Sequence, residues 1–468
     1  GTGAITAVAE QKITLNANVV VQAVAGNVAF TADNLAGNNG HTLFMNDTAL
    51  IDAGSGTVTL TADGSITLGG LKTTNATAAA VTVTTPSGAV VDGGDTYLEV
   101  EANSGTVTVG AVAGIGAAAN HLETRLHTLQ ATNLTSGGIF VLETDDLIVG
   151  GTGVKTTGGN GPVVVRTSGG ALTLNAEAAA HGTGNVLLAA LGAGTDVVAN
   201  ADVKSGSGHV TVTGARHVTF NAGADLRTSG TGTVNVVAGT GSVTLSDTSL
   251  FTTGSGHLRV LGGVDVTLGG LSTTGNASVT ATAGSILDAG DTYVDVVAAQ
   301  LRLVAGTGVG TLGVGANALE TTVATLSAQA GAGGINLRET DGLTVDNTGA
   351  TVQAVNPDAT VTPVTDAAQS DLVTTGNGSL VVTTTNGPLT VNEGDADDTG
   401  VSANGTGNVR LSAGGAGSDL GLNADVESGT GHVTLLAADA MTLAATVDVT
   451  TAGGGTVDVL AGTGSLVM

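Results

Sequence analysis

The sequence predicts an all-β protein: a parallel β-solenoid (β-helix) with about three short strands in each coil of about 24 residues. Three observations support this prediction, namely a regular short repeat, strand-like alternation within each repeat, and 76 glycines among 468 residues. Only 1% of the chain is aromatic. The inside of a narrow coil has room for aliphatic side chains but few rings, and its tight corners need glycine, for which positive φ carries no steric cost.

The shorter repeat appears as GxG triplets that recur at a constant spacing of about 24 residues. They begin at Gly182, Gly206, Gly230 and Gly254, and again at Gly405, Gly429 and Gly453. Alternating segments follow them, such as HVTVT at 209–213 and TVNVV at 233–237. This alternation predicts strands, which become buried when each coil stacks on the next. We therefore expect positions 210, 234 and 258 to be axial neighbours.

A longer repeat of roughly 200–223 residues, which contains several of the shorter repeats, is also present. DGGDTY at 92 matches DAGDTY at 288, and ETDDL at 143 matches ETDGL at 339. We expect the tail of a preceding sequence repeat over 1–46, a first solenoid repeat over 47–246 and a second solenoid repeat over 247–468. The second repeat carries about 21 extra residues around 343–375, where Pro357 and Pro363 suit a surface insertion.

Two other structures are compatible with parts of this pattern. LETRLHTLQA at 122 has leucines at helical spacing, and LETTVATLSA at 319 keeps apolar residues at the same positions. Within a solenoid we expect a further strand with a corner at both places. A string of β-sandwiches also has short alternating strands, but such domains normally have a bulky aromatic core and a period near 90–100 residues rather than 24.

The coil pattern GxGxVxLxAxGxIxL, seen at 54–68, resembles the rungs of filamentous-haemagglutinin-type β-solenoids. DGGDTY and TSGGIFVLETDDL resemble repeat arrays in very large surface proteins of Gram-negative bacteria and planctomycetes. The resemblance covers the whole chain, although its coils are longer than those of the haemagglutinin pattern. It implies a structural or adhesive stalk of a giant bacterial protein that is extracellular or at the cell surface.

Charge and hydropathy limit the partners. The chain has 12 Lys and Arg against 39 Asp and Glu, a net charge of -27, which argues against nucleic acid and anionic membranes. No run approaches the roughly 20 apolar residues of a membrane span, so we expect no membrane insertion. Both ends fall inside the repeat, which predicts continuation in a larger chain or end-to-end self-association into a fibre.

The expected function is mechanical: a stalk or filament shaft that projects or links adhesive parts. One alternative is an adhesin that binds a surface glycan or protein through the 343–375 insertion. A second is a β-helix polysaccharide lyase or hydrolase. We expect no enzyme, because such sites need clustered acids with Lys or Arg and aromatic platforms, whereas the 12 basic residues here are scattered.

Acidic groups suggest calcium as the one candidate cofactor. The candidate ligands form the densest acidic cluster of the chain: Glu393, Asp395, Asp397 and Asp398. Calcium takes six to eight oxygen ligands, but the calcium β-roll nonapeptide and the EF-hand loop are both absent, and a solvated acidic loop is the competing interpretation.

Two other recurring groups are assigned structural roles. His209 and His257 lie two coils apart, about 9.6 Å along the axis, which is too far to share a metal. The DxGDTY motif repeats its aspartates and tyrosine, which predicts a corner built on Asp turns with a solvated tyrosine hydroxyl.

Overall fold

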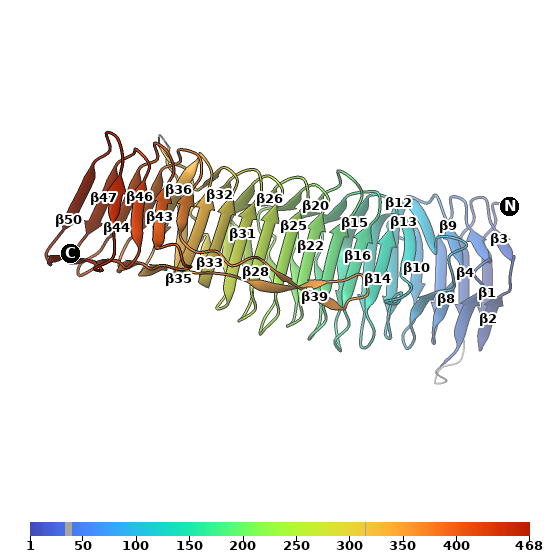
Figure 1. The fold of residues 1–468 in the computed structure, drawn as a ribbon. Coiled ribbons are helices and arrows are strands. Elements are labelled where there is room, and N and C mark those ends of the chain that lie inside the picture. Colours follow the sequence, from blue (N-terminus) through green and yellow to red (C-terminus); the bar gives the residue numbers. More distant parts are fainter. Residues whose placement is uncertain (33–39, 314) are drawn as a thin grey trace. The chain divides into compact units, whose positions relative to one another are not determined.

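The computed structural model describes residues 1–32, 40–313 and 315–468, which form strands and turns. Among these residues no helix is present, and so none of the kind that could cross a membrane. The described residues fall into two compact units, one of 1–229 with 354–362 and one of 230–353 with 363–468. Within each unit, short strands follow one another in stacked coils (Figure 1). The all-β parallel solenoid prediction is confirmed.

The first unit holds three parallel ladders that its coils share. The strands of the N-terminal coils are β1 Ile5–Ala9, β2 Lys12–Leu15, β3 Val20–Gln22, β4 Val28–Ala32, β5 Thr42–Met45, β6 Leu50–Asp52, β7 Val58–Ala62, β8 Ile66–Leu68, β9 Gly70–Lys72, β10 Val81–Thr84 and β11 Val90–Asp92. The next strands are β12 Val100–Ala111, β13 Leu122–Asn133, β14 Ile139–Glu143 and β15 Leu147–Thr156, of which β12, β13 and β15 are long. The last coils hold β16 Val163–Thr167, β17 Leu172–Leu174, β18 Ala178–Ala180, β19 Val186–Ala190, β20 Val197–Ala199, β21 Val203–Ser205, β22 Val210–Gly214, β23 Val218–Phe220 and β24 Leu226–Arg227.

The second unit repeats this organisation. Its first strands are β25 Val234–Ala238, β26 Val243–Leu245, β27 Leu250–Thr252, β28 Leu258–Gly262, β29 Val266–Leu268, β30 Gly270–Ser272, β31 Asn276–Ala281 and β32 Ile286–Asp288. The middle strands are β33 Val296–Ala305, β34 Gly308–Val309, β35 Leu319–Ala330, β36 Gly334–Glu339 and β37 Leu343–Val345. The last coils hold β40 Leu372–Thr374, β41 Leu380–Thr384, β42 Leu389–Val391, β43 Thr399–Ala403, β44 Val409–Ala413, β45 Leu420–Leu422, β46 Asp425–Ser428, β47 Val433–Ala437, β48 Met441–Leu443, β49 Val449–Thr451, β50 Val457–Ala461 and β51 Leu466–Val467.

The register of these ladders follows the shorter repeat. In the first unit Val186 pairs with Val210, and in the second Val234 pairs with Leu258, in parallel strands. Inward-facing residues alternate with outward-facing ones, so that β7 reads buried, intermediate, buried, intermediate, buried. Each coil thus buries its aliphatic side chains and uses its backbone groups to bond its neighbours.

The GxG triplets occupy corners where successive coils nearly touch. A Cβ atom on Gly206 would lie 2.4 Å from the carbonyl oxygen of Gly182, and one on Gly256 would lie 1.8 Å from that of Gly232. Real Cβ atoms do not approach a backbone that closely. The corner glycines are therefore required by stacking and not only by turn geometry.

The ETD motifs place a buried glutamate under the preceding coil. Neither Glu143 nor Glu339 is exposed to solvent. Thr124 Oγ1 donates a 2.7 Å hydrogen bond to Glu143 Oε2, and Leu126 N donates at 3.1 Å. Glu339 repeats the same arrangement with the second unit's own residues. The LET segments that donate these bonds are strands (β13 and β35), so the strand prediction is confirmed over the helical alternative.

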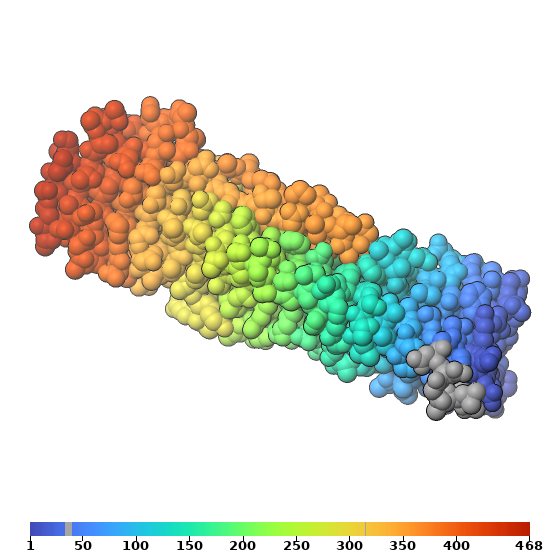
Figure 2. Space-filling model, turned by 90° about the horizontal axis from the view of Figure 1, so that it is seen from below, coloured from blue at the N-terminus to red at the C-terminus, as the bar shows by residue number. Residues whose placement is uncertain are grey.

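The insertion forms a hairpin of strands β38 Thr351–Val355 and β39 Val361–Thr365. Its turn is closed by a hydrogen bond from Asn356 N to Thr360 O. We call residues 346–371 the hairpin, of which 354–362 (the tip) belong to the first unit and the remainder (the stem) to the second. Figure 2 shows this segment in orange on the surface of the molecule.

Candidate functional site

The hairpin tip packs on the outer face of the first unit. Val355 contacts an apolar cluster formed by Phe140, Val164 and Leu187, residues that point outward from their strands and are nevertheless buried. Val355 N donates a 2.9 Å hydrogen bond to Thr211 Oγ1. The outward apolar side chains here are therefore explained by the hairpin that covers them.

The hairpin stem is attached to the second unit mainly by polar contacts. Arg259 Nε donates to Asp366 Oδ1 at 3.0 Å, and both side chains of this ion pair are nearly buried. Arg302 Nε donates to the carbonyl of Ala367 at 2.8 Å. Thr351 N donates to His257 Nδ1 at 3.3 Å, so His257 has a hairpin-binding role that its sequence position did not reveal.

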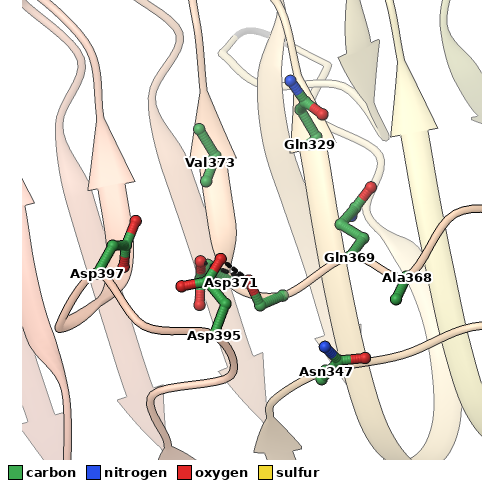
Figure 3. Close-up of a pocket in the computed structure, with 9 residues that line it drawn as sticks. Gln329, Asn347, Ala368, Gln369, Asp371, Val373, Asp395 and Asp397 are labelled. Atoms are coloured by element: carbon green, nitrogen blue, oxygen red, sulfur yellow. Dashed lines mark hydrogen bonds between the residues drawn. The ribbon is translucent and has the colours of Figure 1, made fainter.

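A cavity of about 350 Å³ opens at the foot of the stem (Figure 3). It is lined by Gln329, Asn347, Ala368, Gln369, Ser370, Asp371, Val373, Asp395 and Asp397. Asp371 is central and has a φ of 66°, in the left-handed region that few L residues adopt. Ser370 Oγ lies 2.8 Å from Asp371 Oδ2 and 2.9 Å from Asp395 Oδ2, and donates to one of them at a time.

This cavity holds two of the four predicted calcium candidates. Asp395 and Asp397 lie with Asp371 so that one oxygen of each is within 4.8 Å of the others. Burial raises the pKa of Asp371 to about 6, and the charges of Asp395 and Asp397 add to the shift. Carboxylates so grouped could hold a cation, and calcium at this place stays a prediction.

The other two candidates lie elsewhere. Glu393 and Asp398 line a smaller hollow of about 110 Å³ together with Asn423 and Asp425. Glu393 Oε1 accepts a hydrogen bond from Asp397 N at 3.2 Å, which joins the two ends of the acidic loop. Sequence reasoning missed Asp371 because it comes from the end of the hairpin and not from the acidic run.

Two further acid clusters occupy corresponding places in the two units. We call Asp92, Glu99 and Glu123 the first triad, and Asp288, Asp295 and Glu320 the second triad. In each triad one carboxylate oxygen from every residue lies within 4.8 Å of the others. The central acids, Glu99 and Asp295, are completely buried.

The triads are positioned by the DxGDTY corners. Gly94 N donates to Asp92 Oδ1 at 2.6 Å, and Gly290 N donates to Asp288 Oδ1 at the same distance. These are the predicted Asp turns, and Tyr97 is 39% exposed, as a solvated hydroxyl requires. The corner interpretation is confirmed, but it overlooked the glutamate at 123, which arrives from the next coil.

Burial dominates the electrostatics of both triads. It raises the pKa of Glu99 to about 10, with a further contribution from Asp92. It raises the pKa of Asp295 to about 9, with Asp288 and Glu320 adding to the shift. Three carboxylates at this separation therefore need a proton or a cation among them.

The fold and these acid clusters define the class of the molecule: a repeat protein of the parallel β-solenoid type with carboxylate groups at its corners. Comparison with models of protein families, with curated proteins and with solved structures found no significant match. The class therefore rests on the architecture of the described residues.

Proposed function

We propose that this chain is a segment of the stalk or filament shaft of a large secreted or cell-surface bacterial protein, which projects or links adhesive parts. The supporting observation is the hydrogen bonding of backbone groups from coil to coil within each unit, as in β41, β44, β47 and β50. Hydrogen bonds that run from coil to coil oppose extension along the stacking direction. A net charge of -27 keeps neighbouring copies soluble and apart.

The test is to image the purified chain and to locate it on its source cells. A stalk segment should appear elongated in negative-stain electron microscopy, as single particles or as end-to-end fibres. Antibodies raised against the chain should label intact cells. Round particles, or labelling only after permeabilisation, would contradict the proposal.

An adhesive role for the insertion is the second candidate, and β39 is the observation that favours it. Four of its five residues are exposed, including Val361, and the hairpin is held in place mainly through its other strand and its stem. Deleting the hairpin would uncover the apolar cluster below it, so substitution is the cleaner test. Val361→Glu should lower binding to a glycan array or host surface, whereas Val264→Glu, at a similarly exposed valine, should not. Equal binding by both variants would exclude the hairpin as the contact element.

A further inference from the structure

The oxygens of the first triad are only partly used by the protein. Glu99 Oε2 accepts a 2.7 Å hydrogen bond from Glu123 N, and Asp92 Oδ1 accepts from the corner glycine. Of the four remaining oxygens, Asp92 Oδ2, Glu99 Oε1 and Glu123 Oε2 are buried and have no hydrogen-bond partner among the described residues. A fully buried carboxylate oxygen directed at two others is costly unless a ligand satisfies it.

The second triad repeats this arrangement with its own residues. Glu320 N donates to Asp295 Oδ2 at 2.8 Å, which leaves buried Asp295 Oδ1 without a partner in the part of the chain that the structure describes. The central acid is a glutamate in one unit and an aspartate in the other, so the carboxylate is retained although the side-chain length differs. This second occurrence makes a chance cluster of surface acids a poor explanation.

The geometry points to a hard divalent cation. Two oxygens bound to one Ca²⁺ at about 2.3–2.6 Å lie at most about 5 Å apart, and the three oxygens of each triad are within 4.8 Å of one another. The donor set contains only oxygen, whereas zinc favours His and Cys. Asp92 and Glu123 are partly exposed, so water can complete the shell on the outer side.

We propose that the two acid triads are calcium sites, one in each unit, that fix the DxGDTY corners to the next coil. Calcium binding here is independent of the stalk role and would hold for any function of the solenoid. The first triad should bind more tightly. In the second, Asn317 Nδ2 already donates to Asp288 Oδ2 at 2.7 Å, and the positive charge of Arg338 lies near Glu320.

The chain contains its own optical reporter of these sites. Its only two tyrosines are Tyr97 and Tyr293, one in each DxGDTY corner, and it has no tryptophan. Tyr293 and Glu320 line the same surface hollow, which places this ring beside the second triad. Terbium bound at a triad should therefore emit when tyrosine is excited, and calcium should displace it.

The experiment titrates Tb³⁺ into the purified full chain at neutral pH, then competes with CaCl₂ or MgCl₂. We expect two steps in the tyrosine-sensitised emission, reversed by lower concentrations of calcium than of magnesium. Glu99→Gln should remove the tighter step and Asp295→Asn the weaker one, each with about half of the emission. Asp458→Asn removes one exposed carboxylate far along the sequence from both triads and should change neither step.

Folding is monitored by circular dichroism, and Glu123→Gln supplies a variant at a less buried ligand if Glu99→Gln does not fold. Calcium should also raise the thermal midpoint of the wild type more than that of either triad variant. The proposal is overturned if the wild type shows no calcium-reversible emission, or if the triad variants keep both steps. A midpoint that responds to pH but not to calcium would also overturn it, by showing that a proton occupies the triads instead.

Discussion

Replacing Glu143 by alanine tests whether buried carboxylates fasten one coil to the next. Thr124 Oγ1 and Leu126 N both donate to this side chain, at 2.7 and 3.1 Å, in a site closed to solvent. Thr144 N also donates to it but keeps a second acceptor, the carbonyl of Thr124. Truncation thus leaves two buried donors without an acceptor, at about 1–3 kcal/mol each. Removing the buried carboxyl group also removes its desolvation cost, which offsets part of this loss. We therefore expect a net destabilisation of about 3 kcal/mol.

Native-state hydrogen exchange is the suitable assay, because solenoids need not unfold in one step. A local loss of about 3 kcal/mol corresponds to roughly hundredfold faster exchange of the Leu126 amide. Glu143→Gln keeps a carbonyl that can accept from this amide and should cost only about 1 kcal/mol. In the second unit, Glu339→Ala should likewise accelerate exchange of the Val323 amide. Unchanged exchange at Leu126 in Glu143→Ala, or equal losses in the alanine and glutamine variants, would refute the reasoning.

Three further predictions concern the corners, the hairpin and pH. Gly256→Ala should destabilise the chain by about 3 kcal/mol, because its Cβ would meet a backbone oxygen at 1.8 Å, whereas Gly454→Ala, with open space around it, should be neutral in denaturant unfolding. Val355→Asp should expose residues 354–362 to proteolysis by placing a charge in the apolar cluster, whereas Val361→Asp on the exposed strand should not. In calcium-free buffer the unfolding free energy should fall between about pH 5 and pH 9, because the central acids of the triads keep their protons in the folded state, with pKa values of about 10 and about 9, and release them at lower pH when unfolded. A rise in stability over that pH range, measured by denaturant titration, would contradict the assignment.

The parts of the fold that follow the period could be predicted from the sequence. The regular recurrence of GxG sets the register of the strands. The pairing of Val186 with Val210 could therefore be predicted from the spacing alone. Strand alternation then decided which side chains face inward, as β7 shows. These features are local or strictly periodic, and for that reason they are readable in one chain.

The hairpin contacts could not be read in this way. The position and surface character of the insertion follow from the change in offset and from its prolines. Its docking partners, Thr211 and His257, are chosen by where the hairpin lies on the coils, which no spacing encodes. The outward Phe140 and Leu187 were the available signal, since solvent-facing positions of a solenoid strand are normally polar.

The triads were missed for a different reason. Their acidic residues recur visibly in the sequence, but the recurrence was interpreted only as a structural corner. Asp92, Glu99 and Glu123 all have acidic counterparts in the second unit. The corner explanation accounted for Asp92 alone, since an Asp turn needs one carboxylate. Glu123 lies in the following coil, where the long strand β13 departs from the regular pattern, so its approach to Glu99 becomes visible only in three dimensions.

Buried carboxylates are found where this regular stacking lapses. The triads and the ETD glutamates all lie in or beside the segments β12–β15 and β33–β36, which contain the long strands of each unit. In the first unit the register shifts between Ala102 and Thr106 and again after Leu129. Corner glycines also stack beside these segments, as at Gly161, whose Cβ would lie 1.7 Å from the carbonyl oxygen of Gly137, but a glycine has no side chain that can bond to the next coil. A carboxylate that accepts backbone N–H groups of another coil, as Glu99 and Glu143 do, adds a bond between coils where the register shifts, and the acids accordingly recur with the irregular segment and not with the shorter repeat.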